Sequence, residues 1–231
     1  MKMKLSNDTV TVLKNFSTIN QNLVINPGKN ITTMSAMKNI VAKATVTEDF
    51  PQEFAIYDLN EFLSALSLFE KPDLKFKEDF VVMTESNTPA TKSLKYWYSD
   101  PSVVSTPTKE LAMPECEISF KLSSAMLSDI TKASHVIGAP DMCLEGMDLG
   151  TAVLKVTDKK NTTANDYAVK LDIDNQEQNV PYKFWFKVEN LKLIPGKYDV
   201  NVSSKHISHF WNEKVNVQYW IALEPESAYN V

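Results

Sequence analysis

The same start of a helix occurs twice in this chain, half a chain length apart. The first copy is KLSNDTVTVLKNFSTI, Lys4 to Ile19, and the second is KLSSAMLSDITKASHV, Lys121 to Val136. In both copies a serine follows Lys-Leu at the N-cap position, where its hydroxyl can accept a hydrogen bond from the first turn. Apolar side chains then recur every three or four residues, the period of one buried helix face. The sequence therefore predicts an internal duplication.

Each half is expected to carry two helices. In the first half, the helix capped by Ser6 leaves Lys14 and Asn15 on its polar side and buries Thr9, Val12 or Leu13, Phe16 and Ile19. The next helix, in residues 57–69, begins with Asp58 and Glu61 in a capping-box spacing and has the apolar stripe Leu59, Phe62, Leu63 and Leu66.

The second half repeats this order. Its first helix, capped by Ser123, is expected to bury Leu127, Ile130, Ala133 or Ser134, and Ile137. Its second is a short helical turn in residues 188–193, stopped by Pro195.

Short β-rich runs fill the sequence between these helices, for example NIVAKATV in the first half and YKFWFKV in the second. Between Tyr98 and Glu115 the periodicity stops and three prolines appear, which indicates an extended connector. We therefore predict a domain in residues 1–98, a connector in 99–115 and a second domain in 116–231. Because a broad antiparallel sheet needs helices to cover one face, the predicted class is α+β with two similar domains.

Composition and charge restrict the kind of protein. The 231 residues are 43% hydrophobic and 23% charged, as in soluble globular proteins. No apolar run is long enough to span a membrane, no signal peptide is predicted, and two cysteines are too few for a disulfide framework. The net charge is −5, with 24 lysines and no arginine, which argues against a protein that grips nucleic acid over its whole surface.

No pattern in the sequence favours an enzyme, a metal site or a bound cofactor. His206 and His209 stand three residues apart without a flanking cysteine or carboxylate cluster. The run DIDNQEQ lacks the glycine of a calcium-binding loop, and no glycine-rich phosphate loop is present. Cys143 lies between Met142 and Leu144, which indicates a buried thiol. We predict no catalytic residues, no metal ligands and no cofactor.

Four stretches together identify a resemblance. IYDLNEFLSALSL, DPSVV, PGKYDV and YWIALEPES, in this order on a duplicated chain, resemble the sliding clamps of T4-type bacteriophages, the processivity factors of DNA polymerase. Residues 85–95 and 159–165 depart from the family pattern.

The resemblance implies a closed ring of three subunits joined head to tail, with helices lining the hole and sheets forming the outer wall. Duplex DNA passes through the hole without sequence-specific contacts. The implied partners are the C-terminal peptide of the phage DNA polymerase, a separate ATP-driven clamp loader and, as in some relatives, late-transcription factors. The implied location is the cytoplasm of the host cell.

Two groups of residues are expected to carry this function. The DNA-facing group comprises basic residues on or beside the helices: Lys4, Lys14, Lys121, Lys132, His135, Lys187 and Lys192. Surface lysines are ordinarily solvated without a partner, so helix phase indicates their side and not their distance from DNA.

The second group is an apolar pocket for partner peptides, implied by the resemblance near the connector and the final strand. Its residues are Met37, Ile40, Val103, Val104, Trp220, Ala222 and Leu223. Trp220 and Leu223 also fit the core of an alternating strand. The alternative function is a trimeric, β-rich virion protein that does not bind DNA, and a hydrolase is disfavoured because no nucleophile–base pair is present.

Overall fold

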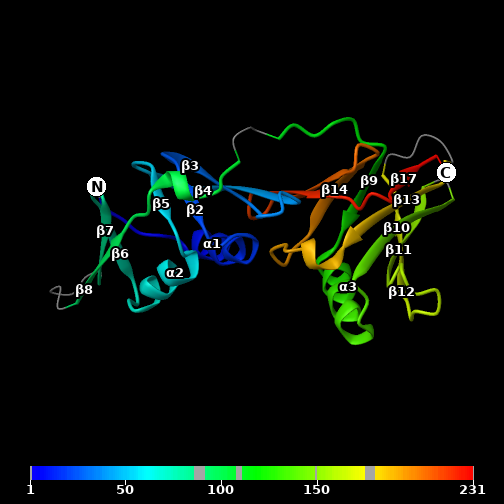
Figure 1. The fold of residues 1–231 in the computed structure, drawn as a ribbon, viewed down its shortest axis with the longest axis horizontal. Helices are drawn as coiled ribbons and strands as arrows, with labels where there is room; N and C mark the ends of the chain where they lie inside the picture. Colours follow the sequence, from blue (N-terminus) through cyan, green and yellow to red (C-terminus); the bar gives the residue numbers. More distant parts are fainter. Residues whose placement is uncertain (1, 86–91, 108–110, 149, 175–179, 231) are drawn as a thin grey trace. The chain divides into compact units, whose positions relative to one another are not determined.

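The computed structural model describes residues 2–85, 92–107, 111–148, 150–174 and 180–230, without the side chains of residues 147 and 148. The chain forms two compact units (Figure 1). Unit 1 contains Met1–Lys109 and Val215–Val217, and unit 2 contains Glu110–Lys214 and Gln218–Val231. The main division therefore falls inside the predicted connector, and the boundaries 1–98, 99–115 and 116–231 remain our proposal for the domains.

Unit 1 has two helices and two antiparallel groups of strands. The first group has the order β5-β2-β3-β4, and the second is a sheet of order β1-β6-β7-β8. The helices are α1 (Asn7–Ile19) and α2 (Leu59–Ser67), and the strands are β1 (Lys2–Met3), β2 (Leu23–Ile25), β3 (Gly28–Met34), β4 (Ile40–Phe50), β5 (Phe54–Ile56), β6 (Pro72–Phe76), β7 (Phe80–Glu85) and β8 (Ser93–Trp97).

The two predicted helices of unit 1 are confirmed, with their caps. The Ser6 hydroxyl accepts a hydrogen bond from the Thr9 N–H at 3.2 Å, and the buried face of α1 is the predicted one. At α2, Asp58 accepts from the N–H groups of Asn60 and Glu61 at 2.9 and 3.1 Å. The stripe of α2 differs at one position, because Ala65 is buried and Leu63 is half-buried.

Unit 2 repeats the plan with one α-helix. Its strand groups have the orders β16-β15-β14-β9 and β12-β11-β10-β13-β17. The helix is α3 (Ser124–Ile137), and the strands are β9 (Ile118–Leu122), β10 (Asp141–Asp148), β11 (Thr151–Thr157), β12 (Tyr167–Asp172), β13 (Tyr182–Lys187), β14 (Tyr198–Ser203), β15 (Ile207–Asn212), β16 (Val217–Ala222) and β17 (Ala228–Tyr229).

The fourth expected helix is a single 3₁₀ turn, η2 (Val188–Asn190). Its N-cap residue, Lys187, makes no side-chain capping bond, and Pro195 prevents a longer helix from forming. So few residues between a strand and a proline cannot offset the cost of helix nucleation. The described part of the chain therefore carries three α-helices rather than two in each half.

Helix α3 begins as predicted for the duplicated segment. The Ser123 hydroxyl accepts from the Met126 N–H at 3.1 Å, and Gly138 ends the helix in the left-handed conformation at φ 66°. Leu127, Ile130 and Ser134 are its buried residues, whereas Ile137, which was also expected to be buried, is half-buried at the last turn of the helix.

The core of unit 2 leaves no space beside Gly146 on β10. A Cβ atom at this position would overlap the ring of Tyr182, which is fully buried on β13. Burial raises the pKa of the Tyr182 phenol to about 12.

Candidate DNA-facing and partner-binding surfaces

A buried carboxylate on β4 fixes the start of helix α1. Glu48 is 8% exposed, and it accepts hydrogen bonds from the Ser6 N–H and from the Thr9 hydroxyl. Burial raises the pKa of this carboxyl, but these hydrogen bonds outweigh burial and hold the pKa below its ordinary value. Glu48 thus carries a negative charge at the helix N-terminus, where the macrodipole favours it. It fixes the helix that presents Lys14.

Two of the predicted DNA-facing lysines border one hollow in unit 1. Lys4 and Lys14 are exposed at the start and the middle of the α1 segment. They lie with Lys71 around a hollow of about 300 Å³ between the N-terminal part of α1 and the end of α2. Leu66 and Phe69 contribute apolar side chains to its lining. Lys71 was not predicted, because it follows α2 in a segment without helical period.

The predicted residues on the α3 segment are also exposed. Lys132 and His135 lie on α3, and Lys121 lies on β9 just before the Ser123 cap. The His135 ring nitrogen Nδ1 donates to the Thr131 carbonyl at 2.7 Å, one turn earlier in the helix. Lys132 and His135 therefore lie on the solvent-facing side of α3, as the sequence predicted.

The last two predicted lysines have different surroundings. The Nζ of Lys187 lies 2.5 Å from a carboxylate oxygen of Asp141, which is 1% exposed and also accepts from the Lys159 N–H at 3.1 Å. This ion pair neutralises the charge of Lys187 locally, so it contributes less to a basic surface than an unpaired lysine would. Lys192 is half-buried after η2.

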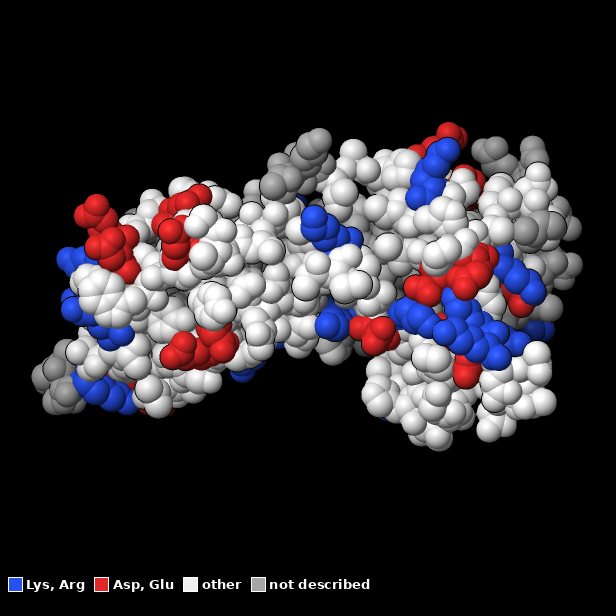
Figure 2. All heavy atoms as spheres, in the orientation of Figure 1, with Lys and Arg blue, Asp and Glu red and all other residues white. Residues whose placement is uncertain are grey.

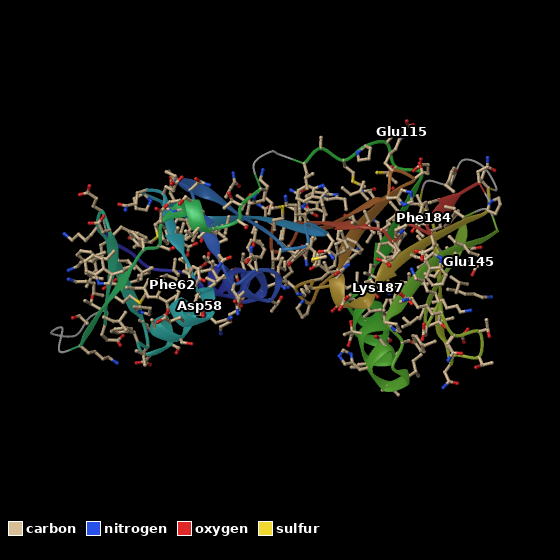
Figure 3. All side chains as sticks on the ribbon, in the orientation of Figure 1. Asp58, Phe62, Glu115, Glu145, Phe184 and Lys187 are labelled. Carbon is tan, nitrogen blue, oxygen red and sulfur yellow. The ribbon has the colours of Figure 1, made fainter. Side chains whose placement is uncertain are left out.

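Positive and negative side chains are mixed around this pair in unit 2 (Figure 2). Lys159 Nζ lies 3.2 Å from Glu224 and 2.8 Å from Glu226, and Lys183 Nζ lies 2.9 Å from Glu145. Lys187 and Glu145 are labelled on this unit in Figure 3. Because these lysines are matched by carboxylates, the sheet side of unit 2 is not a uniformly basic surface.

The connector begins with a 3₁₀ turn that packs on unit 1. In η1 (Pro101–Val103), Asp100 caps the turn by accepting from the Ser102 N–H at 2.8 Å. Val103 is 57% exposed, whereas Val104 is 8% exposed and lies in a cluster with Val24 and Ala55. The two predicted pocket valines are therefore separated into one exposed side chain and one that anchors the connector.

The other two predicted pocket residues of unit 1 also differ from each other in exposure. Met37 is 83% exposed in the turn after β3, and Ile40 is buried at the start of β4.

The pocket residues of unit 2 lie at the end of β16. Trp220 and Leu223 are buried and Ala222 is half-buried. The Trp220 ring lies 5.0 Å from that of His209, and its buried Nε1–H has no hydrogen-bond partner within the described residues. Burial lowers the pKa of His209 despite its hydrogen bond with Gln218.

Sites for other chemistry are not seen in the part of the chain that the structure describes. Within the ranges that the structure describes, no group of three or more His, Cys, Asp or Glu side chains could hold a metal ion. No helix in these ranges is long and apolar enough to cross a membrane. Cys143 is buried, and burial raises the pKa of its thiol to about 12, so the thiol is not an activated nucleophile.

Comparison with known proteins gives matches to both halves of the chain. The family model "DNA polymerase processivity factor" matches residues 6–96, and the model "gp45 sliding clamp, C terminal" matches residues 119–225. The chain is 33% identical over 226 residues to the sliding clamp of Vibrio phage KVP40, covering 96% of this chain and 99% of the relative. It is 28% identical to the sliding clamp of Escherichia phage RB69, covering 99% of this chain and 100% of the relative.

Solved structures share the fold at low sequence identity. The proliferating cellular nuclear antigen of Entamoeba histolytica matches with a TM-score of 0.72 and 15% identity, covering 96% of this chain and 98% of that chain. That of Thermococcus kodakaraensis matches with a TM-score of 0.70 and 12% identity, covering 96% and 99%. These similarities support the two-unit α+β fold.

Proposed function

Since this chain belongs to the sliding clamp family of T4-type bacteriophages, we propose that it encircles duplex DNA as a closed ring and tethers the replicative polymerase. The observation that carries the proposal is that both halves of one duplicated chain match clamp models in the order that the fold requires. A clamp of this kind is a scaffold, so we propose no catalysis by the chain itself. Its place of action is the cytoplasm of the host cell.

A net charge of −5 is compatible with this role if the ring holds DNA by topology. Each neutralised phosphate releases counterions and adds affinity, so many tight contacts would slow sliding. A closed ring cannot leave a long duplex sideways, and weak contacts suffice. The exposed lysines on the helix segments, Lys4, Lys14, Lys121 and Lys132, are our candidates for these weak contacts, with His135 beside them and Lys192 after η2.

Ring closure requires two different edges of the chain to pair head to tail. In unit 1 the four-stranded sheet ends in β1, of two residues, and β8, of five residues. In unit 2 the five-stranded sheet ends in β17, of two residues, and β12, of six residues. Long unpaired edges invite strand addition. We infer that β8 of one subunit pairs with β12 of the next, three times around the ring.

Tethering is assigned to the apolar residues around the connector and the final strand. Val103 and Met37 expose apolar side chains in unit 1, and Ala222 is half-buried at the end of β16 in unit 2. A few apolar anchors carry most of the affinity in peptide recognition. We propose that these side chains contact the C-terminal peptide of the phage polymerase. The loading of the ring by an ATP-driven clamp loader and a role with late-transcription factors belong to the same proposal.

The proposal is tested by mass and by function. Light scattering across a dilution series should give a mass near three subunits, and the protein should lengthen the products of its cognate polymerase and loader on a primed circular template. A trimer that leaves product length unchanged would instead favour the β-rich virion protein without a DNA function. A monomer at every concentration would contradict the ring.

A further inference from the structure

The free edge of β8 offers its backbone groups at three positions. The Tyr98 N–H donates to the Asp79 carbonyl at 2.9 Å, on the side of β7. Because backbone groups alternate in direction along a strand, residues 94 and 96 also face β7. Ser93, Lys95 and Trp97 therefore direct their N–H and C=O groups to the free edge. The next such position is occupied, because the Ser99 N–H donates to the Ala55 carbonyl at 2.9 Å.

The free edge of β12 offers the same number of positions. The Ile173 N–H donates to the Gly150 carbonyl at 2.8 Å, on the side of β11, so residues 167, 169 and 171 face β11. Ala168, Lys170 and Asp172 direct their backbone groups outward. This edge also ends at an occupied position, because the Asp174 N–H donates to the Ser119 carbonyl at 2.7 Å.

On the proposed function, which makes β8 and β12 partners, we propose a single register for the subunit interface. An antiparallel ladder that pairs all three outward positions on each edge places Ser93 opposite Asp172, Lys95 opposite Lys170, and Trp97 opposite Ala168. Both occupied positions then fall beyond the ends of the ladder. A shift by two residues in either direction would remove one of the three hydrogen-bonded pairs within these strands.

The side chains on one face of the proposed ladder, which we call the inner face, agree with this register. Leu94, Tyr96 and Tyr98 are half-buried in the isolated chain. The register places them opposite the apolar residues Leu171, Val169 and Tyr167. A hollow of about 400 Å³ lined by Tyr96, Tyr98 and Tyr57 lies beside the β8 edge. Side chains from β12 of the neighbouring subunit can fill it.

On the opposite face of the ladder, which carries Lys95, the same register brings two like charges together. Lys95 lies over the rings of Phe80 and Trp97, 4.5 and 5.3 Å from their centres. Lys170 is exposed, and no ion pair of its side chain is seen among the described residues. Like charges directly opposite each other in a sheet are destabilising. Asp172 is a diagonal neighbour of Lys95 and offsets this repulsion only in part.

The interface is therefore held by backbone hydrogen bonds and apolar contacts and weakened by its central lysine pair. Salt screens the repulsion between exposed charges, so raising the salt concentration should strengthen the ring instead of weakening it. Such an interface stays closed on DNA but needs less work to open for loading.

Engineered disulfides test the register. In a variant with Cys116→Ser and Cys143→Ala, the pair Ser93→Cys with Asp172→Cys should give a head-to-tail ladder of linked subunits under mild oxidation. The pair Lys95→Cys with Asp172→Cys reports the register shifted one way, and Ser93→Cys with Lys170→Cys reports the other. Opposite residues in a ladder satisfy disulfide geometry, whereas residues displaced by two positions do not.

If the cysteines at positions 93 and 172 link most completely, the register is supported. If either of the two shifted cysteine pairs links instead, the register is overturned. A trimeric mass without links from any pair overturns the pairing of β8 with β12 and leaves the ring intact. A monomeric mass in every variant overturns the proposed function as well. The failures of the two proposals are thus distinguishable.

Charge reversal tests the lysine pair independently. Lys170→Glu should lower the concentration at which the trimer dissociates about tenfold per interface and should remove the strengthening by salt. Lys160→Glu, an equal charge change on an exposed turn, is the matched control and should have little effect. Lys170→Glu together with Lys95→Glu again places two like charges opposite each other, so it should cancel the increase in trimer stability. If Lys170→Glu alone weakens the trimer, the proposal that Lys95 and Lys170 lie opposite each other is wrong.

Discussion

Replacing Glu48 by alanine should detach the start of helix α1 from β4. The carboxylate is buried and accepts from two donors at the helix N-terminus, the Ser6 N–H and the Thr9 hydroxyl. With alanine both donors lose this acceptor in a site with little water. The first turn of the helix that presents Lys14 would then be less firmly held.

The cost can be estimated from the two hydrogen bonds. A hydrogen bond to a charged group contributes about 1.5–3 kcal/mol. Two such bonds, with a small gain from rehydration of the first turn, predict a loss of about 4 kcal/mol for Glu48→Ala. This is a large share of the roughly 5–15 kcal/mol that stabilises a typical domain. Glu48→Gln keeps the volume and one acceptor, so it should cost about half as much.

The effect should depend on pH in a definite direction. The folded pKa of Glu48 lies below the ordinary value of a glutamate, which is about 4.3 in an unfolded chain. Its stabilisation is therefore complete above about pH 5 and is lost as the pH falls through the folded pKa. The difference between wild type and Glu48→Gln should shrink on acidification.

Urea unfolding followed by circular dichroism at pH 7 and pH 4 measures these differences, and hydrogen exchange of the α1 amides gives a local readout. Asp49→Ala, the exposed neighbour on β4, is the matched control and should change stability by less than about 0.5 kcal/mol. A loss of unfolding free energy below about 1 kcal/mol for Glu48→Ala would refute the anchoring role of Glu48. Equal losses for Glu48→Ala and the control Asp49→Ala would refute it as well.

Three further predictions concern DNA, partners and the core. Lys14→Glu with Lys132→Glu should shorten polymerase products at moderate salt while the trimer mass stays the same; unchanged product length would contradict their DNA-facing role. Met37→Asp with Val103→Asp, at two exposed positions, should weaken binding of the polymerase C-terminal peptide in a titration calorimeter, with circular dichroism as the folding control, and wild-type affinity would exclude these residues as peptide contacts. Gly146→Ala should destabilise unit 2 by about 1–3 kcal/mol in thermal unfolding, because its methyl group overlaps the facing tyrosine ring; unchanged stability would show that the ring can move aside.

Local signals in the sequence predicted the helices well. Ser6, Asp58 and Ser123 each accept the hydrogen bond expected of an N-cap, because capping depends on residues within one turn. The short helical turn predicted in residues 188–193 is a 3₁₀ turn and not an α-helix for a local reason as well, since η2 has no capping side chain and too few residues before Pro195. Its period resembled a helix, but nucleation needs more length.

Contacts between distant residues could not be predicted in the same way. Glu48 stands in a strand of alternating residues, and its partners lie about forty positions earlier in the chain. Lys187 was expected to face DNA because it lies beside the fourth predicted helix, but it forms an ion pair with Asp141, 46 positions away in the sequence. The packing of Val104 against Val24 and Ala55 likewise depends on the fold. The family resemblance predicts which surfaces act, whereas the surroundings of each side chain on them depend on the tertiary packing.

We propose that the chain holds DNA by enclosing it. The most direct measurement loads the clamp on nicked circular plasmid, removes free protein by gel filtration, and follows retention before and after one restriction cut. If the ring encloses DNA, the clamp should stay on circles at moderate salt and be lost from the cut DNA through its ends. Equal loss from circular and linear DNA, or equal retention on both, would contradict topological enclosure.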